Sequence, residues 1–238
     1  MKKRRVLIIA HEYSPCGITA SRRPGGFVKY LREFGWEPVV VTRKWTRDNC
    51  NFDESVVPNL PADVQVHEIF YPRNPVGLHH LLTQFVRICL PPLHPWLYIR
   101  EGKKAIDEII RHGSFDVVWT TAPPANSMDI ATYAARKLDA PLVVDFRDVL
   151  QWIPNIFVRL TMPLRILHER RMLSMASAIT AVSNGFARTL KLRHRCDPIT
   201  LSHGFDDELW SGVPVISTPR FNLVYTGSLV LGKPNLRP

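Results

Sequence analysis

Short, continuous apolar runs separated by longer amphipathic segments constrain the fold of this chain more than any other feature. Val6–Ala10, Val39–Val41 and Leu142–Val144 are runs of this kind. They are typical of parallel strands that are buried on both faces, whereas a half-exposed strand alternates apolar and polar residues. The sequence therefore predicts an α/β fold in which a parallel sheet carries helices on both of its faces.

The segment between the first two runs predicts a helix preceded by a candidate anion site. The helix is expected to open at Gly25 and Gly26, to end at Gly35, and to carry one apolar stripe made of Phe27, Tyr30, Leu31 and Phe34. Arg22 and Arg23 precede it, and arginines beside a helix N-terminus suit a phosphate or a carboxylate. The alternative is that both are solvated charges. The G-x-G-x-x-G fingerprint is absent, which disfavours a nicotinamide- or flavin-binding domain.

A charged cluster follows directly on the run Leu142–Val144. Its members are Asp145, Arg147 and Asp148. In open parallel sheets, ligands bind outside the carboxyl ends of the strands, where the strand order reverses. The cluster therefore forms either the polar floor of a cleft or an ion pair that only closes the loop, and the residues alone leave both interpretations open.

Further strands and helices complete the expected βα alternation. Weak alternation and apolar runs predict four more strands, at Val64–Ile69, Phe115–Thr120, Ala178–Val182 and Ile199–Ser202. Helices are expected over Arg100–His112 and Ile156–Met175, with Pro163 marking a start or a break in the second. Asn126 or Ser127 is expected to cap one helix and Ser183 another.

The charge balance favours anionic partners. Lys and Arg number 31 against 21 Asp and Glu, and the formal net charge is +10. Zinc-finger spacings, basic zippers and aromatic-basic strand motifs are missing from the sequence, which disfavours nucleic acid as a partner. The four cysteines show no metal or redox spacing. We therefore expect reduced thiols, no metal site and no bound cofactor, in a cytoplasmic protein.

Two segments bear on membrane contact. The basic Met1–Arg5 precedes an apolar run that is too short for a signal-peptide core. The sequence lacks the stretch of roughly 20 apolar residues that a spanning helix needs. The apolar and basic segment Pro75–Ile99 is either a helix packed on the sheet or a segment that lies on a membrane surface. Peripheral contact with the inner face of the plasma membrane therefore stays open.

The composition changes after residue 202. A proline-dotted connection begins at His203, and Phe221–Thr226 starts a fresh apolar strand. The predicted organisation is a first domain over residues 1–202, an interdomain linker over 203–220, and the start of an incomplete second domain over 221–238.

The order of several motifs is more specific than any one of them. These motifs are Val6–Ala10 with Gly25 and Gly26, Trp119–Pro124, Val143–Asp148, Glu169–Ser183 and His203–Asp206. Together they resemble the acceptor-side half of a retaining, family 4-like GT-B glycosyltransferase, and Phe221–Lys233 is similar to the first strand and phosphate loop of its donor-binding domain. The resemblance covers nearly the whole chain. It implies a Rossmann-like amino-terminal domain followed by the first strand of a truncated second Rossmann-like domain.

The resemblance also implies roles for individual residues. In this family the acceptor binds near the first loop, so the cleft would be lined by Gly17, Arg22, Arg23, Gly25, Gly26, Asp145, Arg147, Asp148 and Ser183. The donor phosphates would be approached by Gly227, Ser228 and Lys233. The linker turn would contain His203, Gly204 and Asp206. The catalytic residues stay unknown.

Two departures from the family limit what the resemblance implies. His203 stands where the family usually has Asn, which tolerates left-handed backbone better than most residues. The paired glutamates and most of the phosphate clamp, where such an enzyme gains most, would lie beyond Pro238.

The implied chemistry is transfer of a sugar from a nucleotide-sugar to a glycan or lipid-linked glycan in the synthesis of cell-envelope polysaccharide. The chain is expected to be incomplete as a stand-alone catalyst. The alternative is a non-catalytic interaction module that pairs with a separate donor-domain chain or with the membrane.

Overall fold

The computed structural model describes residues 3–49, 51–55, 60–71, 96–149, 156–211 and 221–223. The chain divides into two compact units, Met1–Gly204 and Phe205–Pro238. The first unit contains the whole described sheet. The predicted strand over Val224–Thr226 and the predicted donor-side residues Gly227, Ser228 and Lys233 lie outside the described residues.

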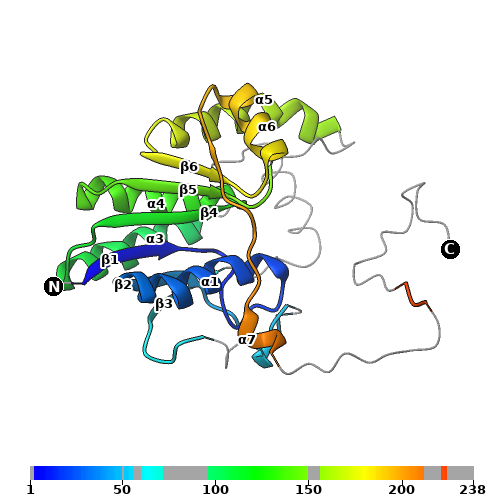
Figure 1. Ribbon diagram of the computed structural model, residues 1–238. Helices are drawn as coiled ribbons and strands as arrows, with labels where there is room; N and C mark the ends of the chain where they lie inside the picture. The colour runs from blue at the N-terminus through cyan, green and yellow to red at the C-terminus, as the bar shows by residue number, and fades with distance from the viewer. Residues whose placement is uncertain are drawn as a thin grey trace. The chain divides into compact units, whose positions relative to one another are not determined.

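A single parallel sheet forms the centre of the first unit (Figure 1). Its seven strands lie in the order β3-β2-β1-β4-β5-β6-β7, and every neighbouring pair is parallel. The strands are β1 (Arg4–Ile9), β2 (Trp36–Arg43), β3 (Gln65–Ile69), β4 (Val117–Ala122), β5 (Leu142–Phe146), β6 (Ala178–Ala181) and β7 (Ile199–Thr200). This confirms the predicted Rossmann-like parallel sheet, because the strand order reverses between β1 and β4.

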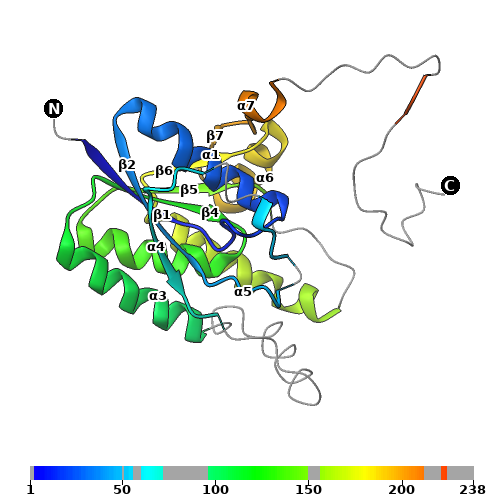
Figure 2. The ribbon, with the colours of Figure 1, turned by 90° about the horizontal axis from the view of Figure 1, so that it is seen from below.

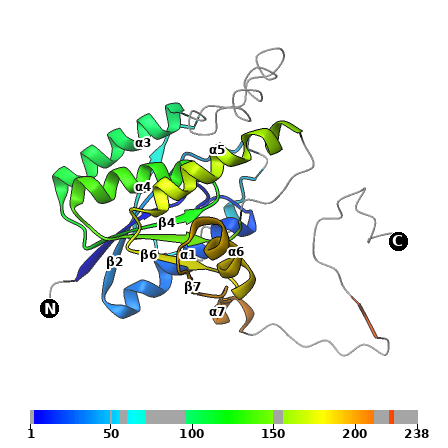
Figure 3. The ribbon, with the colours of Figure 1, turned by 90° about the horizontal axis from the view of Figure 1, so that it is seen from above.

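Helices cover both faces of the sheet, as predicted (Figures 2 and 3). One face carries α3 (Trp96–Ile109), α4 (Ala125–Leu138) and α5 (Ile156–Leu173), and the other carries α1 (Arg22–Tyr30). Helix α6 (Asn184–His194) packs beside α5, and its Leu190 is buried in the same cluster as Met172 and Leu173 of α5. Short 3-10 helices precede α1 (η1, Thr19–Ser21), follow α1 (η2, Leu31–Phe34) and follow α3 (η5, Ile110–His112).

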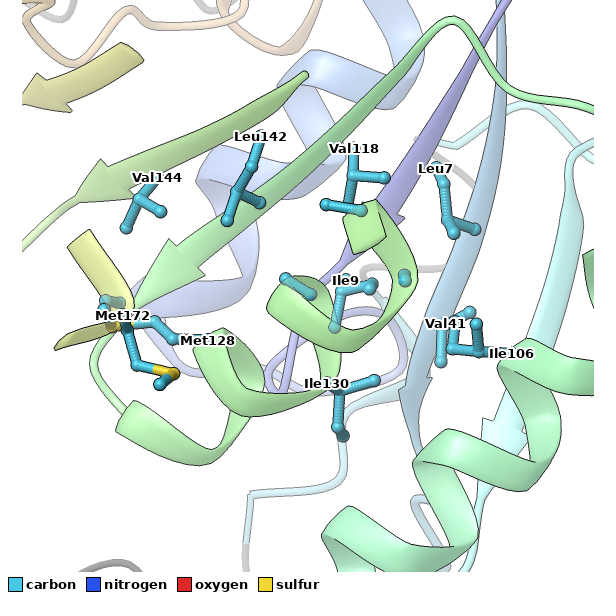
Figure 4. Packing of buried hydrophobic residues seen from close by; sticks show 14 of the residues in the cluster. Leu7, Ile9, Val41, Ile106, Val118, Met128, Ile130, Leu142, Val144 and Met172 are labelled. Carbon is cyan, nitrogen blue, oxygen red and sulfur yellow. The ribbon is translucent and has the colours of Figure 1, made fainter. Parts of the chain in front are cut away.

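The apolar runs are continuous because each strand packs helices on both sides. Leu7 and Ile9 of β1 lie in one buried cluster with Ile106 of α3 and Ile130 of α4 (Figure 4). The alternate residues Val6 and Ile8 lie in a second cluster with Val28 of α1. Successive side chains of a strand point to opposite faces, so a strand covered on both faces is apolar at successive positions, as Val6–Ile9 are.

The first helix begins earlier than the glycine pair indicated. α1 opens at Arg22, and Pro24 occupies its first turn, where a proline costs no hydrogen bond. The apolar stripe also differs from the prediction, because α1 tightens into η2 and leaves Phe34 exposed. Gly35 ends the segment in the left-handed region, at φ 77°, as predicted.

Three other helix predictions are wrong in detail. Helix α3 begins at Trp96 rather than at Arg100. Asn126 and Ser127 do not cap α4: both are buried inside it, and the N-cap is Pro124. Pro163 neither starts nor breaks α5, which runs through it. Pro163 lies on the exposed side of the helix, where water can bind the carbonyl that loses its intrahelical partner.

The second unit is described over a few residues. Helix α7 (Asp207–Trp210) begins after Asp206, whose carboxylate accepts a hydrogen bond from the Glu208 amide at 3.2 Å. Phe221 and Leu223 are almost fully exposed. The predicted linker and second-domain boundaries stay a prediction, as does membrane contact by Pro75–Ile99, of which Trp96–Ile99 is described. Among the described helices, none is long and apolar enough to cross a bilayer.

Candidate functional site

Polar side chains gather where the strand order reverses. The loops after β1, β4 and β5 leave the same edge of the sheet, and the N-terminus of α1 faces this edge (Figure 2). His11 and Glu12 follow β1. Asp145 lies inside β5, opposite Thr121 of β4 and Thr180 of β6, and Arg147 follows the strand. The site is built from these residues together with Arg23 of α1.

Arg23 and Asp145 form a buried, two-pronged ion pair. Arg23 Nε donates to Asp145 Oδ2 and Arg23 Nη2 to Asp145 Oδ1, each at 2.7 Å. The side chain of Asp145 is fully buried and that of Arg23 is 5% exposed. Thr180 Oγ1 donates a further bond of 2.6 Å to Asp145 Oδ1. Charges are stable at such depth only when they are paired and their remaining hydrogen bonds are made.

The same guanidinium also binds the two residues that follow β7. Arg23 Nη2 donates to the carbonyl of Leu201 at 2.9 Å, and Nη1 donates to the carbonyl of Ser202 at 3.2 Å. Arg23 therefore joins α1, β5 and the segment that leads to Gly204. The sequence suggested that Arg23 holds a carboxylate; here that carboxylate belongs to Asp145, so Arg23 acts as a positioning residue.

A second ion pair lies at the same edge. Arg147 Nη2 donates to Glu12 Oε2 at 2.6 Å and also to the carbonyl of Pro123. Burial raises the pKa of the Glu12 carboxyl, against the opposing pull of Arg147. Arg147 Nη1 is buried and has no hydrogen-bond partner among the residues the structure describes. It is therefore a donor that a bound molecule can satisfy.

His203 lies near this cluster. Partial burial, together with the positive charges of Arg23 and Arg147, lowers the pKa of His203. His203, Arg23, Asp145 and Arg147 are thus near enough to interact electrostatically. Gly204 has open space around its Cα.

The other predicted residues lie around the cluster rather than in it. Arg22 is exposed, and the pKa of Asp53 is lowered mainly by hydrogen bonds from Ser55 and to a smaller extent by the charge of Arg22. Asp148 accepts a hydrogen bond from the next amide, that of Val149, at 2.8 Å. Ser183 caps α6 as predicted, accepting a hydrogen bond from the Phe186 amide at 3.2 Å.

The three glycines predicted to line the cleft differ in their surroundings. A Cβ at Gly17 would lie 2.6 Å from Cβ of Asp53, so glycine there lets the 51–53 loop approach. Gly25 is buried in the first turns of α1 beside Leu60, and Gly26 has free space. Ligand binding by these glycines, by Arg22, by Asp148 and by Ser183 stays a prediction.

An aromatic cluster beside the ion pairs escaped the sequence analysis. The ring centroids of His11, Tyr71 and Tyr98 lie 4.8 to 5.3 Å apart in edge-to-face contacts. The Arg43 guanidinium lies 4.3 Å from the Tyr71 ring centroid and 4.0 Å from that of Trp45. The available signal was weak: His11 and Arg43 are polar residues at strand ends, whereas the tyrosines come from distant segments.

Two polar atoms in the aromatic cluster lack partners. Tyr98 Oη and Arg43 Nε are buried without a hydrogen bond in the described part of the chain. Buried donors of this kind are normally satisfied by protein, water or ligand. Groups of His, Cys, Asp and Glu suited to a metal ion do not occur among the described residues. The arrangement therefore suits a polar, uncharged or anionic organic molecule.

Solved structures with the same fold include a sucrose-phosphate synthase and a starch synthase. Sucrose-phosphate synthase from Thermosynechococcus elongatus aligns with a TM-score of 0.59 at 11% identity, over 87% of this chain and 49% of that one. HepE from Anabaena, in complex with UDP and glucose, aligns with a TM-score of 0.53 at 14% identity, over 89% and 47%. The catalytic domain of starch synthase IV from Arabidopsis thaliana, bound to ADP and acarbose, gives 0.52 at 15% identity, over 88% and 53%.

The chain spans about half the length of the solved structures it matches. A comparison with curated proteins gives no match. The family model described as the glycosyl transferase 4-like domain matches residues 19–200. That match covers well over half of the sequence and includes six of the seven strands. The chain therefore belongs to the glycosyl transferase 4-like domain family, and its first unit has the fold of a GT-B glycosyltransferase half.

Proposed function

We propose that this chain is the acceptor-side half of a glycosyltransferase that moves a sugar from a nucleoside-diphosphate sugar to a glycan or lipid-linked glycan. The observation that carries the proposal is that Arg43 Nε and Arg147 Nη1, near the paired charges at the carboxyl edge of the sheet, are buried without a hydrogen-bond partner in the described part of the chain. This is the edge where ligands of open α/β sheets bind.

The aromatic cluster gives the proposed site its preference for a sugar. Tyr71, the half-buried ring of the cluster, offers apolar surface to the C–H face of a sugar ring, while Arg43 Nε and Arg147 Nη1 can bond its hydroxyls. The pair of Arg23 and Asp145 is too deeply buried to react. Its role is to position α1 and the residues Leu201 and Ser202. We assign no catalytic base.

The donor side of the proposal is supported by relatives. The HepE structures contain UDP with glucose or UDP-glucose, and the starch synthase structure contains ADP and acarbose. By analogy, a nucleotide-sugar would be held mainly by a second domain. We place the reaction in the cytoplasm, with the acceptor reaching the enzyme from the cell envelope.

Isothermal titration of the full chain tests whether it binds the acceptor glycan and leaves the nucleotide-sugar to a second domain. We expect heat on titration with glycan fragments and little heat with UDP-glucose or ADP-glucose. Tyr71→Leu, which removes the half-buried ring of the cluster, should weaken glycan binding about tenfold. The matched control is Tyr133→Leu, which removes a tyrosine outside the cluster whose hydroxyl bonds Asp107. Tight nucleotide-sugar binding together with no glycan binding would contradict the proposal.

A second candidate is a non-catalytic module that pairs with a separate donor-domain chain. The two candidates differ in the DNA that follows the reading frame. An open frame encoding the paired glutamates next to this one supports a split or continuing enzyme. A lack of such a frame, combined with no transfer activity, supports the module.

A further inference from the structure

Helix α5 is apolar on the side that faces away from the sheet. Leu160, Leu164 and Leu167 are 68%, 53% and 62% exposed. They recur at i, i+4 and i+7, which places them on one stripe of the helix. The inward side is also apolar, since Met172 and Leu173 are buried in the main core (Figure 4). A helix that is apolar on both sides normally has a partner for each of them.

The same stripe becomes basic at its C-terminal end. Arg170 and Arg171 are exposed and continue the line of the three leucines by one further turn. Arg170 Nη2 donates to the carbonyl of Arg193 at 2.7 Å, so the C-terminal ends of α5 and α6 are joined. Figure 1 shows the two helices side by side beyond β6. The exposed surface therefore continues from α5 onto α6.

Helix α6 extends the pattern. Leu192 is 79% exposed, and Arg188 and the C-cap residue Arg195 are exposed near it. Lys191 is exposed as well, but its charge is matched by Asp197 at 2.7 Å.

Acidic residues are nearly absent from the two helices. Their sequences contain seven Lys and Arg and a single acidic residue, Glu169. Glu169 is buried beside His194, at 3.0 Å between the Oε2 and Nε2 atoms, and so does not offset the charge at the surface. We name the exposed set Leu160, Leu164, Leu167, Arg170, Arg171, Arg188, Leu192 and Arg195 the α5–α6 face.

We propose that the α5–α6 face binds the surface of an anionic lipid bilayer, with the leucines of α5 inserted at the headgroup boundary and the arginines on the lipid phosphates. Leucines along one line with arginines beside them are typical of helices that lie in the membrane interface. Each Lys or Arg near an anionic surface strengthens binding roughly fivefold. This proposal does not depend on the chemistry of the carboxyl edge.

Other occupants fit the face less well. Nucleic acid would use the arginines but not the row of leucines. A second copy on a two-fold axis would bring the same arginines against one another, because such an interface pairs identical patches, and like charges at a dry contact are costly. An anionic bilayer satisfies both the apolar and the basic part of the face.

Cosedimentation of the full chain with vesicles tests the proposal. We expect binding to vesicles of equal parts phosphatidylglycerol and phosphatidylcholine, and much weaker binding to pure phosphatidylcholine. Raising the salt to about 1 M, where charges are screened beyond about 3 Å, should weaken binding strongly. The triple variant Leu160→Gln/Leu164→Gln/Leu167→Gln should lose binding by at least about a hundredfold, and Arg171→Gln should lose roughly fivefold.

Two matched variants control for apolar exposure and for charge in general. Phe34→Gln removes an apolar side chain that is 71% exposed in η2, and Arg111→Gln removes an exposed charge in η5. Both should bind like the unaltered chain, and all variants should keep its melting temperature because every substituted side chain is at the surface. Sedimentation velocity should show the same oligomeric state for the triple variant and the unaltered chain.

Three results would overturn the proposal. The first is equal binding to charged and uncharged vesicles. The second is unchanged vesicle binding by the triple variant, which would place the contact elsewhere on the chain. The third is a change of oligomeric state in the triple variant without lipid binding by the unaltered chain, which would make the face a contact between copies.

Discussion

The two edges of the sheet hold arginine–aspartate pairs of the same kind in opposite surroundings. At the carboxyl edge, Arg23 and Asp145 are 5% and 0% exposed. At the amino edge, Arg32 of η2 and Asp63, just before β3, are 36% and 68% exposed. Both pairs are two-pronged. The two pairs differ mainly in burial, so comparing them shows how burial changes the contribution of an ion pair to stability.

Burial makes the carboxyl-edge pair depend on its neighbours. A charge removed from water must recover its lost hydration through hydrogen bonds, and Thr180, Leu201 and Ser202 supply the bonds that Arg23 and Asp145 do not make to each other. The amino-edge pair keeps water around it and needs no such support. The carboxyl-edge pair therefore connects α1 to β5 and to the residues after β7, whereas the amino-edge pair connects only Arg32 to Asp63.

The largest expected effect comes from removing one buried charge. Asp145→Asn leaves the Arg23 guanidinium buried without its counter-charge, and we expect the free energy of unfolding to fall by about 3–5 kcal/mol. Urea denaturation followed by circular dichroism measures this.

Asp148→Asn is the matched control, because Asp148 follows the same strand but is only half-buried and bonds its neighbouring amide. Replacing both members, as Arg23→Met with Asp145→Leu, should recover much of the loss. A single-variant loss no larger than that of the control would show that burial is not the deciding variable.

The next effect separates charge from geometry at the same place. Arg23→Lys keeps the positive charge but cannot reach Asp145, Leu201 and Ser202 together, because an ammonium lacks the fork of a guanidinium. We expect a loss of about 2 kcal/mol in the free energy of unfolding. Hydrogen exchange should also accelerate at the Leu201 amide, which bonds the carbonyl of Ala181. An unchanged exchange rate at this amide would mean that Arg23 does not stabilise the segment Leu201–Ser202.

A smaller effect depends on pH at the second buried pair. Burial raises the pKa of Glu12 above its ordinary value of 4.5, so the folded state binds this proton more tightly than the unfolded state. Its contribution is then fully present below pH 4.5 and is lost as the pH rises through the folded pKa.

Glu12→Gln should therefore gain stability relative to the unaltered chain between pH 4 and pH 7, by less than the two effects above. Urea denaturation at several pH values measures the difference. Glu33→Gln in η2, whose carboxylate lies outside the buried edge, serves as the control. A difference between Glu12→Gln and the unaltered chain that does not vary with pH contradicts the assignment.

The contrast between the edges also explains which parts the sequence revealed. The strands were predictable because runs such as Leu7–Ile9 and Val39–Val41 have no polar position, a direct consequence of burial on both faces. The end of β5 was predicted two residues too early, at Val144 rather than at Phe146. A carboxylate normally marks the end of a buried strand, and here Asp145 continues the strand because Arg23 neutralises it.

The pairing itself could not be read from the sequence. Arg23 and Asp145 are 122 positions apart, and Arg22 is chemically the same as Arg23. Which of the two turns inward depends on where α1 begins, and that boundary was predicted three residues too late. The aromatic cluster escaped for the same reason, because Tyr71 and Tyr98 meet His11 only through the topology of the sheet.

The smallest expected effect closes the comparison at the amino edge. Arg32→Gln breaks the two-pronged contact with Asp63, which lowers the pKa of Asp63 through a hydrogen bond. Both groups stay in water, where screening and the side-chain entropy of holding them together offset the attraction. We expect no measurable change in the urea midpoint at neutral pH and moderate salt. A loss approaching that of Asp145→Asn would mean that the geometry of a pair, rather than its burial, determines how much it contributes to the free energy of unfolding. The buried pair at the carboxyl edge would then stabilise the protein no more than an exposed pair of the same geometry.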